Sequence, residues 1–260
     1  MPDPRPIGVF DSGVGGLVVL AEIHRLLPSE DLVYFADSAH FPYGDRPETE
    51  VRALAEAATK RLLERDVKLI VIACNTATSA AAERLRARFA VPFVAMEPAV
   101  KPAASRSRTG RIAVLATAGT VEGKRLAALV ERYGNGASVR AVAGTGLAEA
   151  VERGDLEPVA LLRNALAPLL REPVDALALG CTHYFFLRPA IERLLGPGVQ
   201  VLDTAEPVAR RVRQVLEERD LQAPPDHVGV VTYATSGDPE AFARLRARLR
   251  AVLALPEESR

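Results

Sequence analysis

The sequence predicts an α/β protein made of two pseudo-symmetric parallel-sheet domains. Short apolar runs alternate with helix-like segments along the chain, as strands and helices do in a parallel sheet. The two cysteines close two such runs, LIVIAC at Cys74 and LALGC at Cys181, and small polar residues follow each. The sequence IGVFDSGVGG from Ile7 has an echo, IAVLATAGTV, 105 residues later at Ile112, and the cysteines lie 107 residues apart. Two matched pairs at nearly one spacing indicate a duplicated unit.

Each expected strand is a short apolar run that ends in glycine or a polar residue. These runs occupy residues 7–10, 32–36, 69–74, 91–95, 112–116, 139–143, 177–181, 199–202 and 228–233. Because ligands gather beyond the carboxyl ends of strands in open α/β sheets, the polar residues that follow these runs are the candidate site.

Each expected helix is a longer segment with apolar residues on one face, as with Val51, Leu54, Ala58 and Leu62. These segments occupy residues 17–27, 48–66, 78–89, 121–133, 147–153, 156–171, 188–195, 208–218 and 240–253. Residues 101–110 are rich in Pro, Ser, Arg and Gly and are interpreted as a crossing between domains. The predicted first domain comprises residues 1–97 and 206–260, and the second comprises residues 98–205.

Composition limits the classes of partner. The 260 residues carry 33 basic and 33 acidic side chains, so a surface built to neutralise phosphates is not expected. Tryptophan is absent and aromatic residues are few, which argues against stacking on nucleobases. The N-terminus has no basic segment followed by an apolar one, and no apolar run is long enough to span a membrane. We therefore expect a cytoplasmic protein with reduced cysteines that binds neither nucleic acid nor membrane.

Two thiols at equivalent strand ends suit a reaction with two bases. One thiolate would remove a proton from carbon, and the opposite thiol would return a proton to the other face, which inverts the stereocentre. Hydroxyl and amide donors at the strand ends could stabilise the charge that develops on the substrate carboxylate. The donors expected there are Ser12, Asn75, Thr76, Thr117, Thr120 and Thr182.

Each thiol also needs a neighbouring group that controls whether the sulfur carries a proton. Asp11 ends the first strand and is the candidate beside Cys74, while His183, two residues after Cys181, could be oriented by Glu152. The alternatives are structural: Asp11 could be a loop residue or a helix cap, and His183 could be a buried histidine with satisfied hydrogen bonds.

Four motifs in this order carry a resemblance to a known family: GVFDSGVGG at residues 8–16, PYG at 42–44, ACNTAT at 73–78 and GCTHY at 180–184. The chain resembles the cofactor-independent glutamate racemases through nearly its whole length, including TSGDP at residues 235–239. Members interconvert L- and D-glutamate without pyridoxal phosphate and supply D-glutamate for peptidoglycan. The resemblance implies an active site in a cleft between the two domains, no cofactor, no metal and a homodimer.

The resemblance also implies roles for individual residues. Cys74 would act on the D-isomer and Cys181 on the L-isomer, with Asp11, Glu152 and His183 assisting. Substrate-binding positions would be Asp11, Ser12, Pro42, Tyr43, Gly44, Asn75, Thr76, Thr117, Thr120, Thr182 and His183. Two departures from the family pattern occur. The segment before Glu152 lacks the usual Cys-Pro, so Glu149 competes with Glu152 for its role, and Phe185 replaces a usual proline after GCTHY.

Several rival functions remain open from the sequence. A related racemase could act on aspartate or a hydantoin, although PYG with DSGVGG favours glutamate. A cysteine hydrolase with His183 as base would leave the second thiol idle. A zinc site would need more ligands than the Cys-Thr-His fragment offers, and GVGG is not a dinucleotide fingerprint. A redox pair is disfavoured because no C-x-x-C motif is present.

Overall fold

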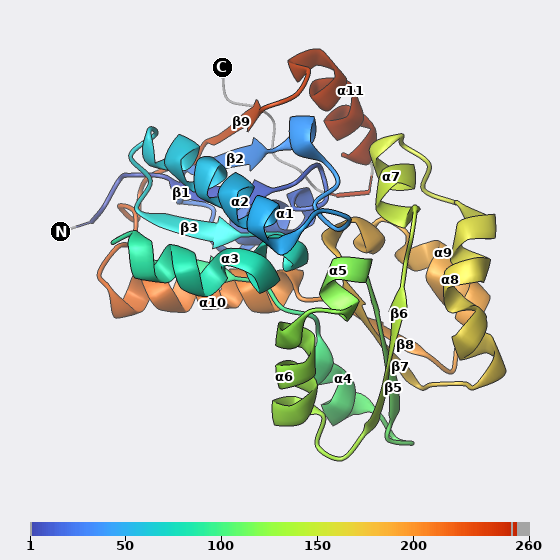
Figure 1. The fold of residues 1–260 in the computed structure, drawn as a ribbon. Coiled ribbons are helices and arrows are strands. Elements are labelled where there is room, and N and C mark those ends of the chain that lie inside the picture. The colour runs from blue at the N-terminus through green and yellow to red at the C-terminus, as the bar shows by residue number, and fades with distance from the viewer. Residues whose placement is uncertain (1, 251, 254–260) are drawn as a thin grey trace. The chain divides into compact units, whose positions relative to one another are not determined.

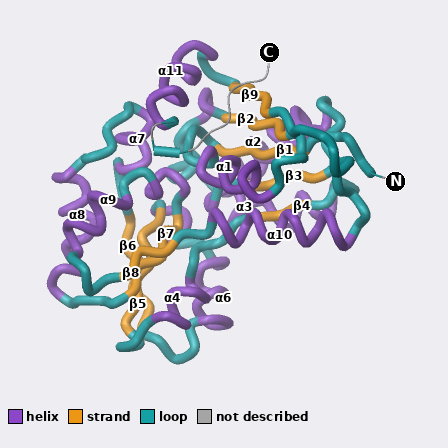
Figure 2. Tube along the Cα trace, turned by 180° about the vertical axis from the view of Figure 1, so that it is seen from behind, coloured by secondary structure: helices purple, strands orange, loops and turns teal. Residues whose placement is uncertain are grey.

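The computed structural model describes residues 2–250 and 252–253 and divides the chain into two compact units. Unit 1 comprises Met1–Met96 with Ala205–Arg260, and unit 2 comprises Glu97–Thr204. Each unit is a parallel sheet flanked by helices (Figures 1 and 2). In the described part of the chain, no helix is long and apolar enough to cross a membrane.

Unit 1 contains, within the described residues, a five-stranded sheet in the order β4-β3-β1-β2-β9. All its paired strands are parallel. The strands are β1 (Ile7–Asp11), β2 (Leu32–Ala36), β3 (Leu69–Ile72), β4 (Phe93–Ala95) and β9 (Val231–Thr235). The register pairs Asp11 with Ala36 and Ala36 with Thr235, so the carboxyl ends of β1, β2 and β9 lie side by side.

Helices cover both faces of this sheet because successive strand residues point to opposite faces. Phe10, Ile70 and Ile72 pack with residues of α2 (Glu48–Leu63) and α3 (Asn75–Arg88) in one buried cluster. Val9 and Val71, one position away in the same strands, are also buried. The remaining helical elements of the unit are α1 (Leu17–Leu26), α10 (Ala205–Glu218), α11 (Pro239–Leu249) and the short 3-10 turn η1 (Ser38–His40).

Unit 2 contains, in its described residues, a four-stranded parallel sheet in the order β6-β5-β7-β8. The strands are β5 (Arg111–Ala116), β6 (Ser138–Ala143), β7 (Ala176–Gly180) and β8 (Gln200–Leu202). One face is covered by α4 (Val100–Arg106) and α6 (Lys124–Tyr133), and the other by α8 (Val159–Arg171) and α9 (Arg188–Leu195) (Figure 1). The shorter elements are α5 (Ala118–Val121), α7 (Leu147–Glu152) and the 3-10 turn η2 (Thr182–Phe185).

The two sheets share one connectivity. In each unit the first strand is central, the second lies on one side, and the third and fourth follow on the other, giving β4-β3-β1-β2 and β8-β7-β5-β6. Unit 1 adds β9 beside β2. Cys74 follows the third strand of unit 1 and Cys181 the third strand of unit 2, so the two thiols occupy equivalent strand ends. The predicted α/β fold with two similar parallel sheets is confirmed.

Several predicted segments differ from the structure, among them the helix at 121–133, which forms as α5 and α6. Residues 101–110 are not only a crossing, because α4 forms there and buries Val100 and Ala103. The helix predicted from residue 78 starts at Asn75, since Cys74 itself is the helix cap. The strand predicted at 228–233 is β9, Val231–Thr235, because the N–H groups of residues 229 and 230 donate to Pro28 O and Asp31 Oδ1 and not to β2.

The cap of α11 offers a local stability test. Asp238 accepts hydrogen bonds from Glu240 N at 2.9 Å and Ala241 N at 3.3 Å. We expect Asp238→Ala to lower the free energy of unfolding by about 1 kcal/mol, measured by urea denaturation. Asp238→Asn keeps an accepting oxygen and is the control. An alanine variant as stable as the asparagine variant would contradict this account.

Candidate active site

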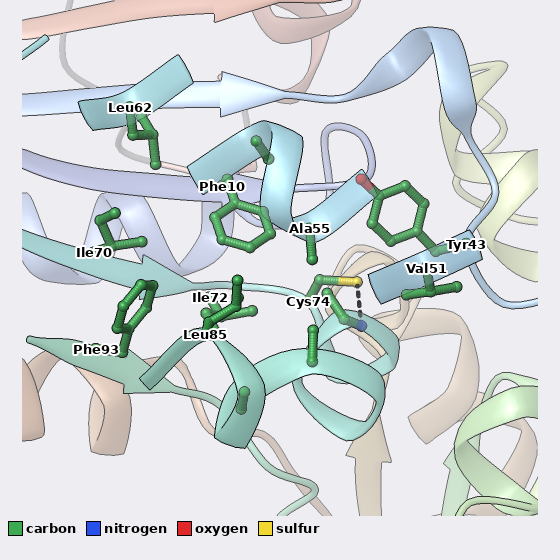
Figure 3. Close-up of a cluster of buried hydrophobic side chains, with 14 of the residues drawn as sticks. Phe10, Tyr43, Val51, Ala55, Leu62, Ile70, Ile72, Cys74, Leu85 and Phe93 are labelled. Carbon is green, nitrogen blue, oxygen red and sulfur yellow. Dashed lines mark hydrogen bonds between the residues drawn. The ribbon is translucent and has the colours of Figure 1, made fainter. Parts of the chain in front are cut away.

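Cys74 lies at the end of β3, where the chain enters α3. The residue is 5% exposed and its backbone is extended, so its side chain turns back over the first helical turn. Its Sγ accepts a hydrogen bond from Ala77 N at 3.5 Å (Figure 3). An amide at a helix N-terminus stabilises negative charge, so this position favours the thiolate that a base requires.

Asp11 ends β1 and organises the glycine turn after it. Its side chain is fully buried, and its two oxygens accept from Ser12 N at 2.7 Å and Gly16 N at 2.6 Å. Gly16 has no room for a side chain, because a Cβ there would lie 2.8 Å from Asp11 Cβ and 3.0 Å from Ala73 Cβ. The turn is thereby held close to the backbone that leads into Cys74. Asp11 therefore has a structural role in this turn, as the sequence allowed. Its negative charge also contributes to raising the pKa of Tyr43 in the same unit.

The PYG segment brings Tyr43 against Cys74. Tyr43 is 1% exposed and shares the apolar cluster of Cys74 and Val51 (Figure 3). Its hydroxyl donates to Asp37 Oδ2 at 2.6 Å. Burial, and after it the negative charge of Asp37, raises the pKa of Tyr43 far above its ordinary value. The phenol therefore stays protonated and is a fixed donor to Asp37. Pro42 and Gly44 flank Tyr43 in the same loop.

Asn75 and Thr76 begin α3 directly after the thiol. Asn75 is 5% exposed, and neither its amide oxygen nor its amide nitrogen has a hydrogen-bond partner within the described residues. Leaving a buried amide unpaired is costly, so such a group is typical of a site that a polar ligand completes. Thr76 lies beside it and is 9% exposed.

Cys181 in unit 2 has a different partner. It follows β7, is 9% exposed, and its Sγ lies 3.8 Å from His183 Nδ1. His183 Nε2 lies 2.8 Å from Glu152 Oε1, at the last residue of α7. A carboxylate only accepts, so Nε2 carries a hydrogen that it donates to Glu152. Of the two candidate carboxylates, Glu152 rather than Glu149 makes this contact with His183.

These contacts set the charge of His183. Burial alone would lower the pKa of His183, but the hydrogen bonds to Cys181 and Glu152 outweigh it and raise the pKa well above 6.5. The imidazole is therefore held as a cation beside the Cys181 sulfur near neutral pH. Such a cation can stabilise the negative charge of a neighbouring thiolate.

The raised pKa predicts a pH-dependent stability. Because the folded protein holds the proton more tightly than the unfolded chain, the contribution is complete below pH 6.5 and disappears as pH rises through the folded-state pKa. We expect the difference in unfolding free energy between the wild type and His183→Gln to shrink as pH increases above 6.5. Chemical denaturation over a series of pH values measures it. A difference that grows with pH would show that the cation is not stabilised.

Hydroxyl donors also lie at the strand ends of unit 2. Thr117 follows β5 and caps α5, and its Oγ1 donates to Thr120 Oγ1 at 3.1 Å. Thr120 and Thr182 are both buried. Tyr184 donates to Gly144 O at 2.8 Å, which ties η2 to the end of β6. The predicted donors Thr117, Thr120 and Thr182 thus occur at the same edge of this sheet as Cys181.

Both cysteines are free thiols. No group of three or more His, Cys, Asp or Glu side chains able to hold a metal occurs in the part of the chain that the structure describes. Two reduced thiols at equivalent strand ends, one on a helix amide and one beside an imidazolium, are the chemistry that the two units provide.

A scan against protein families matches residues 7–212 to the Asp/Glu/Hydantoin racemase family. The chain belongs to this family. Among its relatives, the glutamate racemase of Roseiflexus sp. is 49% identical over 250 residues, which cover 94% of this chain and 92% of the relative.

Solved structures of the racemase family agree with this assignment. Glutamate racemase from Thermus thermophilus, in complex with beta-chloro-D-alanine, is 40% identical with a TM-score of 0.80, covering 99% of this chain and 98% of that one. Escherichia coli glutamate racemase, in complex with L-glutamate and the activator UDP-MurNAc-Ala, is 33% identical with a TM-score of 0.83, covering 94% and 95%.

Sequence reasoning missed one buried group of this racemase. Asp37 is 4% exposed and accepts a hydrogen bond from the Tyr43 hydroxyl, yet it is not among the candidate residues predicted from the sequence. The signal was available, because Asp37 directly follows β2 just as Asp11 ends β1. Neighbouring parallel strands bring such residues to one edge of the sheet.

Proposed function

We propose that this racemase interconverts L- and D-glutamate by proton transfer between two thiols and the α-carbon. Glutamate racemase activity is supported by the relatives, which match this chain over nearly its whole length. The observation that carries the mechanism is the placement of Cys74 and Cys181 at equivalent strand ends, each with its own hydrogen-bonding partner. In this proposal Cys74 deprotonates D-glutamate and Cys181 deprotonates L-glutamate.

The α-hydrogen of glutamate is only weakly acidic, which makes its removal slow. Hydrogen-bond donors that stabilise the carboxylate as it gains enediolate character would speed this step. Asn75 supports this role, because its buried amide has donors and an acceptor that no described residue uses. Ser12, Thr76, Thr117, Thr120 and Thr182 are the further proposed contacts, together with the Tyr43–Gly44 backbone. The site residues, the cleft between the units, the homodimer and the cytoplasmic location stay predictions from the sequence.

The mechanism assigns different helpers to the two thiols. Cys74 relies on the start of α3, and Asp11 fixes the neighbouring turn. Cys181 relies on the His183 imidazolium, which Glu152 orients. When Cys181 removes the proton of L-glutamate, the Cys74 thiol returns one from the opposite face, and the reverse path exchanges these roles.

Circular dichroism of glutamate tests the function. The purified protein, dialysed against a chelator and without pyridoxal phosphate, should bring L-glutamate and D-glutamate separately to the same signal of zero. Aspartate is the matched comparison, and a hydantoin tests the third family substrate. Faster racemisation of aspartate would overturn the choice of glutamate. Hydrolysis of an amide or ester without inversion would favour the cysteine hydrolase.

A further inference from the structure

Asp37, at the end of β2, is a buried carboxylate with three side-chain partners. Its Oδ2 accepts from the Tyr43 hydroxyl at 2.6 Å, and its Oδ1 accepts from the Ser236 hydroxyl at 2.6 Å. His40 Nδ1 lies 2.9 Å from the same Oδ1. The proposed proton transfer involves neither Asp37 nor Ser236.

Sheet register explains why these residues meet. Asp11 pairs with Ala36, and Ala36 pairs with Thr235, so Asp37 and Ser236 follow neighbouring strands at one edge. Two backbone bonds continue the pattern beyond the ladder: Asp37 N donates to Asp11 O at 2.9 Å, and Ser236 N donates to Ala36 O at 3.0 Å. Asp37 thus lies between the end of β1 and the loop after β9.

Ser236 joins this loop to the turn that precedes the PYG segment. Its hydroxyl donates to Asp37 and accepts from Ala39 N at 3.1 Å. The next residue, Gly237, packs closely on the turn, because a Cβ at Gly237 would lie 3.1 Å from Ser38 Cβ. The loop after β9 therefore holds η1 in place, and η1 leads through Phe41 and Pro42 to Tyr43.

Tyr43 transmits this constraint to the thiol. Its ring packs in the buried cluster with Cys74 (Figure 3). Its hydroxyl, at the far end of the side chain, donates to Asp37. Because the ring is packed and the hydroxyl is hydrogen-bonded, the backbone of Tyr43 is also held in place. In the proposed function, the Tyr43–Gly44 backbone contacts the substrate. Small displacements of such a segment reduce rates strongly, since proton transfer needs a close approach.

We propose that Ser236 and Asp37 are positioning residues for the Cys74 half of the reaction. The Ser236 hydroxyl orients the Asp37 carboxylate, and that carboxylate holds Tyr43 so that the Tyr43–Gly44 segment presents glutamate to Cys74. Neither residue touches the substrate. This inference rests on the proposed function and assigns a role to the segment TSGDP, whose place in the reaction was undefined.

Two variants and isotope effects test the inference. We expect kcat/KM to fall about tenfold in Ser236→Ala and about a hundredfold in Asp37→Asn, while Ser236→Thr, which retains the hydroxyl, recovers most of the loss. Because only the Cys74 step is impaired, the primary isotope effect on kcat/KM should rise with D-[2-²H]glutamate and fall with L-[2-²H]glutamate. A purely structural role would leave this asymmetry unchanged.

Thr232→Val is the matched control, because it removes a hydroxyl in β9, the strand that precedes Ser236, and that hydroxyl donates to Leu32 O at 3.5 Å. It should racemise as the wild type does. Wild-type isotope effects in both Ser236→Ala and Asp37→Asn would overturn the inference, as would a change that is equal for the two enantiomers. If Ser236→Ala does not fold, Asp37→Asn decides alone. A wild-type protein that fails to racemise glutamate would instead refute the proposed function.

Discussion

Cys74→Ala and Cys181→Ala are each expected to reduce racemisation at least about a thousandfold in both directions. In the proposed mechanism each thiol removes the proton in one direction and returns it in the other, so the loss of either interrupts both paths. Circular dichroism at saturating L-glutamate and D-glutamate measures the two rates. The two variants should be inactive to a similar degree, although the sulfurs have different partners.

Folding of the variants is the necessary control for this result. Both cysteines are buried, and replacing a buried thiol by alanine removes one heavy atom, so each variant should unfold cooperatively at a slightly lower temperature. If one alanine variant kept more than a tenth of the wild-type rate, a single base would suffice and the hydrolase-like use of one thiol would gain support.

His183→Asn should lower kcat about a hundredfold, because it removes the imidazolium beside Cys181. Glu152→Gln should cost less, since the amide oxygen of glutamine can still accept from His183 Nε2. The loss should be centred on the Cys181 step, so the primary isotope effect should rise with L-[2-²H]glutamate. Stopped-flow or steady-state kinetics on both labelled enantiomers measures it.

The double variant separates the roles of these two residues. If Glu152 acts only through His183, adding Glu152→Gln to His183→Asn should lower the rate no further. Glu149→Gln is the matched control on the same helix, and it should leave the rate unchanged. Additive losses for Glu152 and His183 would mean that Glu152 contributes independently of the imidazole.

The sequence predicted the folding pattern because apolar runs and polar strand ends recur with a clear period. Cys74, Cys181 and Asp11 are candidate site residues for the same reason, as each ends or follows an apolar strand. Composition could not show that Cys74 would cap α3 itself, because capping by sulfur depends on the extended backbone before the helix.

The network around Asp37 could not be predicted in the same way. The last strand was expected at residues 228–233, whereas β9 ends at Thr235, so Ser236 was not recognised as a residue at a strand end. The shift arises because residues 229 and 230 bond to the chain at Pro28 and Asp31. Contacts between segments about 200 residues apart in sequence, such as Ser236 with Asp37, depend on sheet order, which local pattern does not encode.

The most direct test of two opposed thiols is racemisation of ordinary L-glutamate in D₂O, followed by mass spectrometry of the separated enantiomers at early times. A proton removed by one sulfur and replaced by the other predicts that the D-glutamate formed carries solvent deuterium while the remaining L-glutamate keeps its α-hydrogen. Deuterium that enters both enantiomers equally from the first turnovers would mean that one base serves both faces, and this would contradict the account.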